Sequence, residues 1–233
     1  MNHDKVRESL LGFSKETPIL EVPGSICVVG NGGSLLDSGL GEKIDSFDDV
    51  VRLNTINLAG YELDVGTKFT VWAGNVWGDT GLKSGQSRNP SMLPKDCRAY
   101  VHIPSVLYNK YRRLRDRANR WRSEAKHKNF IARAAVLDSC SAELGIPKTG
   151  VTKMESDRSR KTIFQPSTGI KMIHYLLAGC HVPVVYITGF DFFKQVDSSI
   201  HYYGDVNTSM GHFPDKERAY VDKYIKDGRI IVL

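Results

Sequence analysis

The sequence predicts an α/β fold: a single Rossmann-like domain with a mostly parallel sheet flanked by helices. Short apolar runs rich in β-branched residues alternate with glycine-rich connections between residues 25 and 73. This alternation is typical of the first half of a doubly wound sheet. The 233 residues, 41% of them hydrophobic and 25% charged, suffice for one domain with a sizeable core. We expect residues 25–233 to form that domain and residues 1–24 to form a short helix and a linker.

The strands and helices can be placed along the chain from apolar spacing and from cap residues. Two polar stretches that contain glycine, Gly74–Asp96 and Ile146–Gln165, are predicted to be loops near the site. The predicted strands are Ser25–Val29, Val50–Leu53, Phe69–Ala73, Arg98–Ile103, Val184–Thr188 and the edge strand Arg229–Val232, and the predicted helices are Val106–Glu143 with a break around His127–Asn129, Ser167–Gly179 and Pro214–Lys226.

A glycine-rich turn follows the first strand, and a lone Asn54 follows the second. Gly30, Gly32 and Gly33 let the backbone turn sharply and approach a ligand closely. Asn31 places an amide in that turn, where it can donate to an anionic oxygen. The turn is neither a Walker A loop nor a complete G-x-G-x-x-G motif. It predicts a phosphate or nucleotide site outside the carboxyl ends of parallel strands, with a plain tight turn as the alternative.

The segment Pro166-Ser167-Thr168-Gly169 begins a predicted helix. The first backbone N–H groups of a helix have no partner within it, and the helix dipole favours an anion there. Ser167 and Thr168 add hydroxyl groups, and Gly169 keeps the surface open. Ordinary N-capping explains the same residues.

His201, His212, Glu217 and Asp191 are the titratable candidates near these segments. An imidazole titrates near neutral pH, so His212 is a candidate general base and His201 a candidate cation for a leaving group. Glu217 either orients His212 or favours the N-terminus of the helix that begins near Pro214. Asp191 follows a strand, where we expect it to cap the next turn.

Four motifs resemble those of the animal-type sialyltransferases (glycosyltransferase family 29). CVVGNGGSL and FDDVVRLN together are similar to the long sialylmotif, and Gln165–Phe190 is similar to the short one. His201-Tyr202-Tyr203-Gly204 resembles the third motif, and the segment His212–Glu217 has the spacing of the very short motif. The four occur in the family's order and span most of the chain.

The resemblance implies a glycosyltransferase domain with a sialyltransferase GT-A-variant fold, which transfers sialic acid from CMP-sialic acid to a glycan hydroxyl. It implies a metal-independent inverting displacement in which His212 deprotonates the acceptor and CMP leaves toward His201. CMP-Kdo as donor, and a nucleotide- or glycan-binding protein without catalysis, are the alternatives. No Asp-x-Asp pair occurs, and we expect no metal or cofactor. The implied donor-binding residues are Asn31, Gly32, Gly33, Asn54, Ser167, Thr168, Gly169, Gly189, Phe190 and Tyr202.

The net charge of +6 comes largely from Lys110–Lys128, which carries nine Lys or Arg residues. A solvated helix face is the plain interpretation. The same stripe would also attract an anionic sugar nucleotide or an acidic glycan, or contact a membrane surface peripherally. Nucleic acid is not expected as a partner, because no recognised nucleic-acid-binding module accompanies the stripe.

The N-terminal sequence MNHDKVRESLLGFSKE has charges throughout, and no segment is apolar enough for a signal peptide or membrane anchor. We therefore expect a cytoplasmic protein, unlike the membrane-anchored animal members of the family. The resemblance places Cys27 and Cys180 at its disulfide positions. In a reducing cytoplasm we expect buried thiols instead.

Overall fold

The computed structural model describes residues 19–74, 97–103, 128–131, 134–147, 151–154, 161–192, 201–204 and 212–233. Its main feature is a seven-stranded sheet in the order β5-β4-β3-β2-β1-β8-β9, in which every neighbouring pair is parallel. The predicted α/β class is therefore confirmed. The strands are β1 (Ile26–Val29), β2 (Asp49–Leu53), β3 (Val71–Gly74), β4 (Ala99–His102), β5 (Lys128–Ile131), β8 (Val185–Thr188) and β9 (Ile230–Val232).

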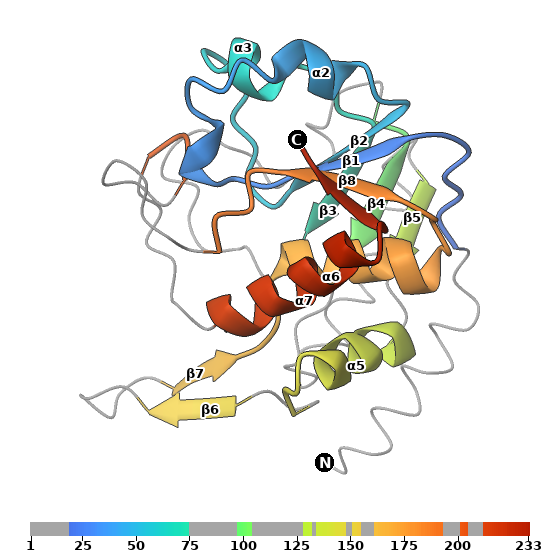
Figure 1. Cartoon of the computed structure of the whole chain (residues 1–233), viewed down its shortest axis with the longest axis vertical. Helices are drawn as coiled ribbons and strands as arrows, with labels where there is room; N and C mark the ends of the chain where they lie inside the picture. Colours follow the sequence, from blue (N-terminus) through green and yellow to red (C-terminus); the bar gives the residue numbers. More distant parts are fainter. Residues whose placement is uncertain are drawn as a thin grey trace.

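Helices cover both faces of this sheet (Figure 1). The short helices α2 (Gly41–Asp45) and α3 (Glu62–Val65) lie over one face, together with the 3-10 turn η1 (Gly33–Leu35). On the other face lie α5 (Ala134–Glu143), α6 (Thr168–His174), its π-helical continuation η4 (Tyr175–Gly179) and α7 (Pro214–Lys226). The predicted helices Ser167–Gly179 and Pro214–Lys226 are confirmed.

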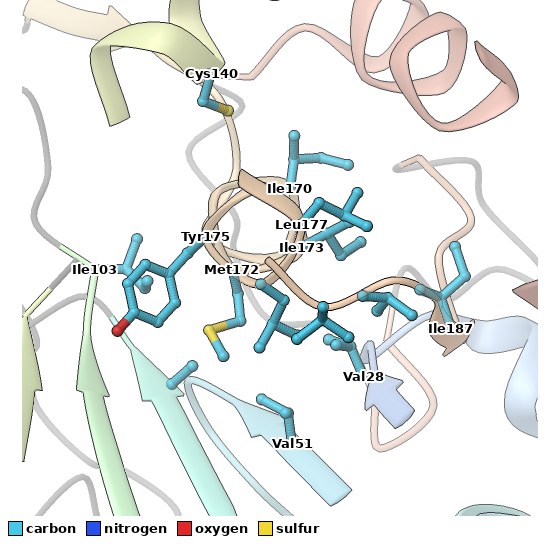
Figure 2. Close-up of a cluster of buried hydrophobic side chains, with 14 of the residues drawn as sticks. Val28, Val51, Ile103, Cys140, Ile170, Met172, Ile173, Tyr175, Leu177 and Ile187 are labelled. Carbon is cyan, nitrogen blue, oxygen red and sulfur yellow. The ribbon is translucent and has the colours of Figure 1, made fainter. Parts of the chain in front are cut away.

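Alternation along the strands divides the core between the two faces of the sheet. Val28 and Val51 face α6, whereas Cys27 and Val50 pack with Ile44 of α2 on the other face. Figure 2 shows the side chains of α6 and η4 gathered above the strand residues of the first of these faces. Because both faces are buried, β1 is apolar throughout rather than alternating, and β2 is buried along its whole length even at Asp49 and Arg52.

The sheet has its switch point at β1. Strands β2 to β5 follow on one side of β1, and β8 and β9 lie on the other. After Val29, Gly30 N–H donates to Thr188 O (2.8 Å) and Gly32 N–H donates to Gly189 O (2.9 Å). The two loops therefore leave the sheet in contact, at the place where open α/β sheets bind ligands.

Two predicted segments are corrected. Lys128–Ile131, expected within a mostly helical region, forms β5 at the edge of the sheet, because it pairs in parallel with β4. The stretch expected to be a loop at Ile146–Gln165 contains a separate antiparallel hairpin of β6 (Val151–Met154) and β7 (Lys161–Phe164). In both, strand pairing overrides a polar, basic local sequence.

Several expectations fall outside the described residues: the helix predicted near the N-terminus, the loop 75–96 and the basic stretch 110–127. Residues 19–22 of the predicted N-terminal segment are described and are not helical. Leu20 is buried in the core, and its N–H donates to Tyr175 Oη (3.2 Å). None of the described helices is long and apolar enough to cross a membrane.

Cys27 and Cys180 are free thiols, as expected, rather than the disulfide that the resemblance implied; Cys27 is buried and Cys180 is partly buried. Cys27 points into the cluster with α2, whereas Cys180 packs against the cluster on the opposite face of the sheet. The sheet itself therefore separates the two sulfur atoms and excludes the alternative disulfide in this fold.

Candidate active site at the switch point

A polar cavity of about 180 Å³ opens where β1, β2 and β8 end, beside the start of α6. Segments far apart in the sequence meet there, and they include the four predicted motifs. The lining residues are Gly30, Asn31, Gly32, Leu53, Asn54, Ser167, Thr168, Gly169, Gly189, Phe190, Asp191, Phe192, His201, His212 and Glu217.

The amide of Asn31 connects the glycine-rich turn to the end of β2. Its Nδ2 donates to Leu53 O and to Thr55 O, each at 3.3 Å. Carbonyl oxygens only accept, so these contacts fix the orientation of the amide and occupy both of its hydrogens. The expected bond from Asn31 to an anionic ligand therefore requires one of these two bonds to be exchanged.

Asn54 stands at the end of β2 in the left-handed backbone region, with φ of 51°. Its N–H donates to Ala73 O (2.9 Å), and its carbonyl accepts from Trp72 Nε1 (2.9 Å). Both backbone groups thus hold Asn54 in a conformation that few residues other than Gly, Asn and Asp adopt readily. The turn ends the strand and keeps Asn54 in the lining of the cavity.

Asp191 fastens the loop after β8 to the turn after β1. Its carboxylate accepts from Ser34 N–H (2.8 Å) and from the Ser34 hydroxyl. The residue acts as a cap, but for the turn η1 rather than for the segment that follows it. Asp191, Phe192 and Leu53 line the cavity without having been predicted as binding residues.

Ser167 is the N-cap of α6, as the capping interpretation expected. Its Oγ accepts from Ile170 N–H (3.3 Å), and its own N–H donates to Glu217 Oε1 (2.8 Å). Glu217 thus holds the start of α6 against α7, in addition to lying in the first turn of α7, where one of its two predicted roles places it.

The hydrogen bonding of His212 defines its tautomer. His212 Nδ1 lies 3.0 Å from the backbone oxygen of Gln165. A carbonyl can only accept, so Nδ1 carries the hydrogen and the lone pair of the neutral ring is on Nε2. Burial lowers the pKa of His212 below 6.5, the bond to Gln165 opposes this, and the charge of Lys171 lowers the pKa further. The imidazole is therefore mostly neutral at pH 7.

His201 and Tyr202 are neighbours in a turn closed by the bond from Gly204 N–H to His201 O (3.0 Å), but they face different surroundings. His201 forms a β-bridge with Gly32 and lines the cavity. Tyr202 is 4% exposed, packs edge-on against Tyr61, and donates to Asn57 O (2.6 Å). Tyr202 and Gly33, which begins η1, are thus absent from the lining of the cavity, and their predicted contacts with a donor have no support in this geometry.

Glu217 and Lys171 are buried ionisable groups beside the cavity. Glu217 is 1% exposed, and burial raises its pKa from 4.5 to about 7, although bonds to Ser167 oppose the shift. Lys171 is 4% exposed, and burial lowers its pKa to about 8. Perturbed groups of this kind are typical of functional sites.

We expect the protein to lose stability between pH 4.5 and pH 7 because of Glu217, and the Glu217→Gln variant to lack this loss. The folded chain keeps the carboxyl proton up to about pH 7, whereas the unfolded chain releases it near 4.5. In that window the folded state binds more protons, so the free energy of unfolding falls as pH rises. Gln retains an oxygen for Ser167 N–H.

Melting temperatures across this range provide the measurement. The wild type and the variant should melt alike at the acid end, and the variant should melt at the higher temperature above pH 7. Parallel curves for the two proteins would show that Glu217 titrates alike in the folded and unfolded chains, so that its pKa is not raised by folding.

Among the residues that the structure describes, no group of three or more His, Cys, Asp or Glu side chains is arranged to hold a metal ion. The lining of the cavity includes amides, hydroxyl groups and imidazoles, which suit an anionic ligand. It also includes apolar side chains and the carboxyl groups of Asp191 and Glu217, which accept hydrogen bonds from Ser34 and Ser167.

A parallel α/β sheet with a polar cavity at its switch point defines a ligand-binding α/β protein, a class that includes many nucleotide-binding enzymes. Comparison with known families makes the assignment specific. The model of glycosyltransferase family 29 (sialyltransferase) matches residues 16–228. The chain therefore belongs to this family, as its motifs predicted.

Curated relatives and solved structures agree with this assignment. The chain is 26% identical over 213 residues to human CMP-N-acetylneuraminate-beta-galactosamide-alpha-2,3-sialyltransferase 4, a match that covers 87% of this chain and 62% of the relative. It is 28% identical over 216 residues to the type 2 lactosamine alpha-2,3-sialyltransferase of Pan troglodytes, a match that covers 81% of this chain and 57% of the relative. The chain thus spans less than two thirds of the length of these relatives.

The fold is similar to that in the crystal structure of a mammalian sialyltransferase. The match has a TM-score of 0.60 and 20% identity, and it covers 100% of this chain and 79% of that one. A crystal structure of a mammalian sialyltransferase in complex with Gal-beta-1-3GalNAc-ortho-nitrophenol matches with a TM-score of 0.57 and 20% identity.

Proposed function

We propose that the chain transfers sialic acid from CMP-sialic acid to a hydroxyl group of a glycan. One observation carries the proposal: His201, His212 and Asn54, which come from three separate motifs, line the same cavity at the switch point of the sheet. Membership of glycosyltransferase family 29 and the names of the relatives, which specify CMP-N-acetylneuraminate, support the choice of donor.

His212 acts as the general base in this proposal. Its Nδ1–H is bonded to Gln165 O, so the unprotonated Nε2 accepts the proton of the acceptor hydroxyl. The acceptor oxygen then forms a bond to the anomeric carbon as the bond from that carbon to the phosphate oxygen of CMP breaks. Attack opposite to the leaving group inverts the configuration.

The departure of CMP leaves negative charge on its phosphate. His201 and Asn54 line the cavity, and there they stabilise that charge by hydrogen bonding. The amide of Asn31 joins them if it exchanges a carbonyl partner for the phosphate. A CMP-sugar has one phosphate, so less charge needs neutralising than on a diphosphate, and the proposed reaction uses no metal.

The test is acceptor-dependent release of CMP. The protein is incubated with CMP-Neu5Ac or CMP-Kdo, each with and without lactose or Gal-β-1,3-GalNAc. We expect release from CMP-Neu5Ac that an acceptor stimulates, and a sialylated product by mass spectrometry. Stimulated release from CMP-Kdo alone would replace sialic acid as the donor sugar. CMP binding without release from either donor would favour a non-catalytic binding protein.

The same assay tests metal independence. Activity should be unchanged within error after treatment with EDTA, because the proposed charge stabilisation comes from side chains. A loss that Mg²⁺ or Mn²⁺ restores would contradict this mechanism while leaving the transfer reaction itself intact.

A further inference from the structure

The ammonium of Lys171 is buried in the middle of the fold, where its charge is costly. Its side chain is 4% exposed and does not line the cavity. Among the described residues it donates one hydrogen bond, from Nζ to Gln165 Oε1 (2.8 Å). A methionine of similar length would fill this position without the cost of desolvating a charge. Packing alone therefore gives no reason for a lysine here.

Gln165 connects Lys171 to His212. Its side-chain oxygen accepts from Lys171, and its backbone oxygen accepts from His212 Nδ1 (3.0 Å). The ammonium and the imidazole are thus held by two oxygens of one residue, which keeps them at a fixed separation. The backbone N–H of Lys171 also donates to Ser167 O (3.0 Å), within the segment that lines the cavity.

The other titratable groups near this network come from α5, α6 and α7. Burial raises the pKa of the Cys140 thiol to about 12 and also raises the pKa of Tyr220, so both are neutral. Burial lowers the pKa of His174, which favours its neutral form. Glu143 is bonded to Lys223 and Tyr224. Asp191 and His201 line the cavity with His212, and the carboxylate of Asp191 is bonded to Ser34. Burial weakens the ionisation of Glu217, and Lys171 is the charge that lowers the pKa of His212.

We infer that Lys171 is a positioning residue that holds a positive charge behind His212 and thereby adds to burial in favouring the neutral imidazole that a general base requires. The charge acts on His212 through space, and Gln165 fixes the distance over which it acts. The role of the neutral imidazole as a base rests on the proposed function. The effect of the Lys171 charge on the pKa of His212 does not depend on any activity and can be measured without it.

The test is an NMR titration of the protein with labelled histidine, with the His212 signal assigned from the His212→Asn variant. We expect the pKa of His212 to rise by about half a unit or more in Lys171→Met, because a nearby positive charge is removed. Lys171→Arg, which keeps the charge, should stay near the wild type. Lys171→Leu is a second neutral variant in case the first fails to fold.

Repeating the titration in a Glu217→Gln background separates the effect of the Lys171 charge on His212 from that of the Glu217 carboxyl group. Lys171→Met should raise the pKa of His212 there too, because the variant still removes a positive charge. An unchanged pKa in a folded neutral variant, in either background, would overturn the inference.

Activity assays distinguish this failure from failure of the proposed function. In an active protein, the acidic limb of the pH profile of kcat/KM should move to higher pH in Lys171→Met, by the shift in the His212 pKa that NMR measures. At pH values well above that limb, kcat should change little. If the wild type shows no transfer with any donor, the proposed function fails, and the NMR titration still decides the role of Lys171.

Discussion

His212→Asn should reduce glycosyl transfer by about 10²- to 10⁴-fold, the usual contribution of a positioned general base. An asparagine amide can still donate to Gln165 O, which now accepts from His212 Nδ1, but it cannot take a proton from the acceptor. The lining of the cavity and the start of α7 should therefore persist. We expect the affinity for CMP, measured by calorimetry, to stay within about threefold while kcat collapses.

His181→Asn is the matched control. His181 is exposed, lies outside the cavity, and has φ of 56°, a conformation that asparagine tolerates. This variant should retain wild-type kcat and CMP affinity. Residual activity of His212→Asn above about one tenth of the wild type would argue for another base, and Glu217, with its pKa raised to about 7, would be the next candidate.

The sheet was predictable because its central strands are buried on both faces. β1 is an uninterrupted apolar run, β2 and β8 are largely apolar, and each of the three is followed by glycine or asparagine. α7 was predicted with its observed bounds, because Pro214 marks the first turn and the apolar residues repeat at helical spacing. β5 could not be predicted in this way, since Lys128–Ile131 becomes a strand only by pairing with β4.

The candidate site was predictable as a set of loops but not as a network. Parallel strands bring their carboxyl ends to one edge, so motifs that follow them must meet. The bonds between those loops join residues as far apart as Ser34 and Asp191. Lys171 lies within an apolar helical sequence, and no local pattern distinguishes it from a solvated lysine. Such contacts depend on tertiary packing, which periodicity does not describe.

Gly30→Ala should weaken both the fold and the site. A Cβ on Gly30 would lie 2.1 Å from the backbone oxygen of Gly189, so the ends of β1 and β8 would have to separate. Gly189 has φ of 69°, which leaves its loop little freedom to move without losing this turn. The bonds from Gly30 N–H to Thr188 O and from Gly32 N–H to Gly189 O would be strained together.

Overpacking of this kind costs about 1–3 kcal/mol, and more where backbone must shift. For a chain of this length, each kcal/mol lowers the melting temperature by about 2–4 °C. We also expect CMP affinity to fall by more than about tenfold, equivalent to about 1.4 kcal/mol, because Asn31 and Gly32 follow directly in the lining of the cavity.

Gly60→Ala separates lost stability from lost binding. Gly60 has φ of 86° and no heavy atom within 4 Å of a built Cβ, so this variant adds backbone strain of about 1–2 kcal/mol away from the cavity. It should melt at a lower temperature and bind CMP normally. If Gly30→Ala loses stability but also binds CMP normally, contact between the loops after β1 and β8 supports the sheet alone, and the donor must then be held mainly from β2 and the start of α6.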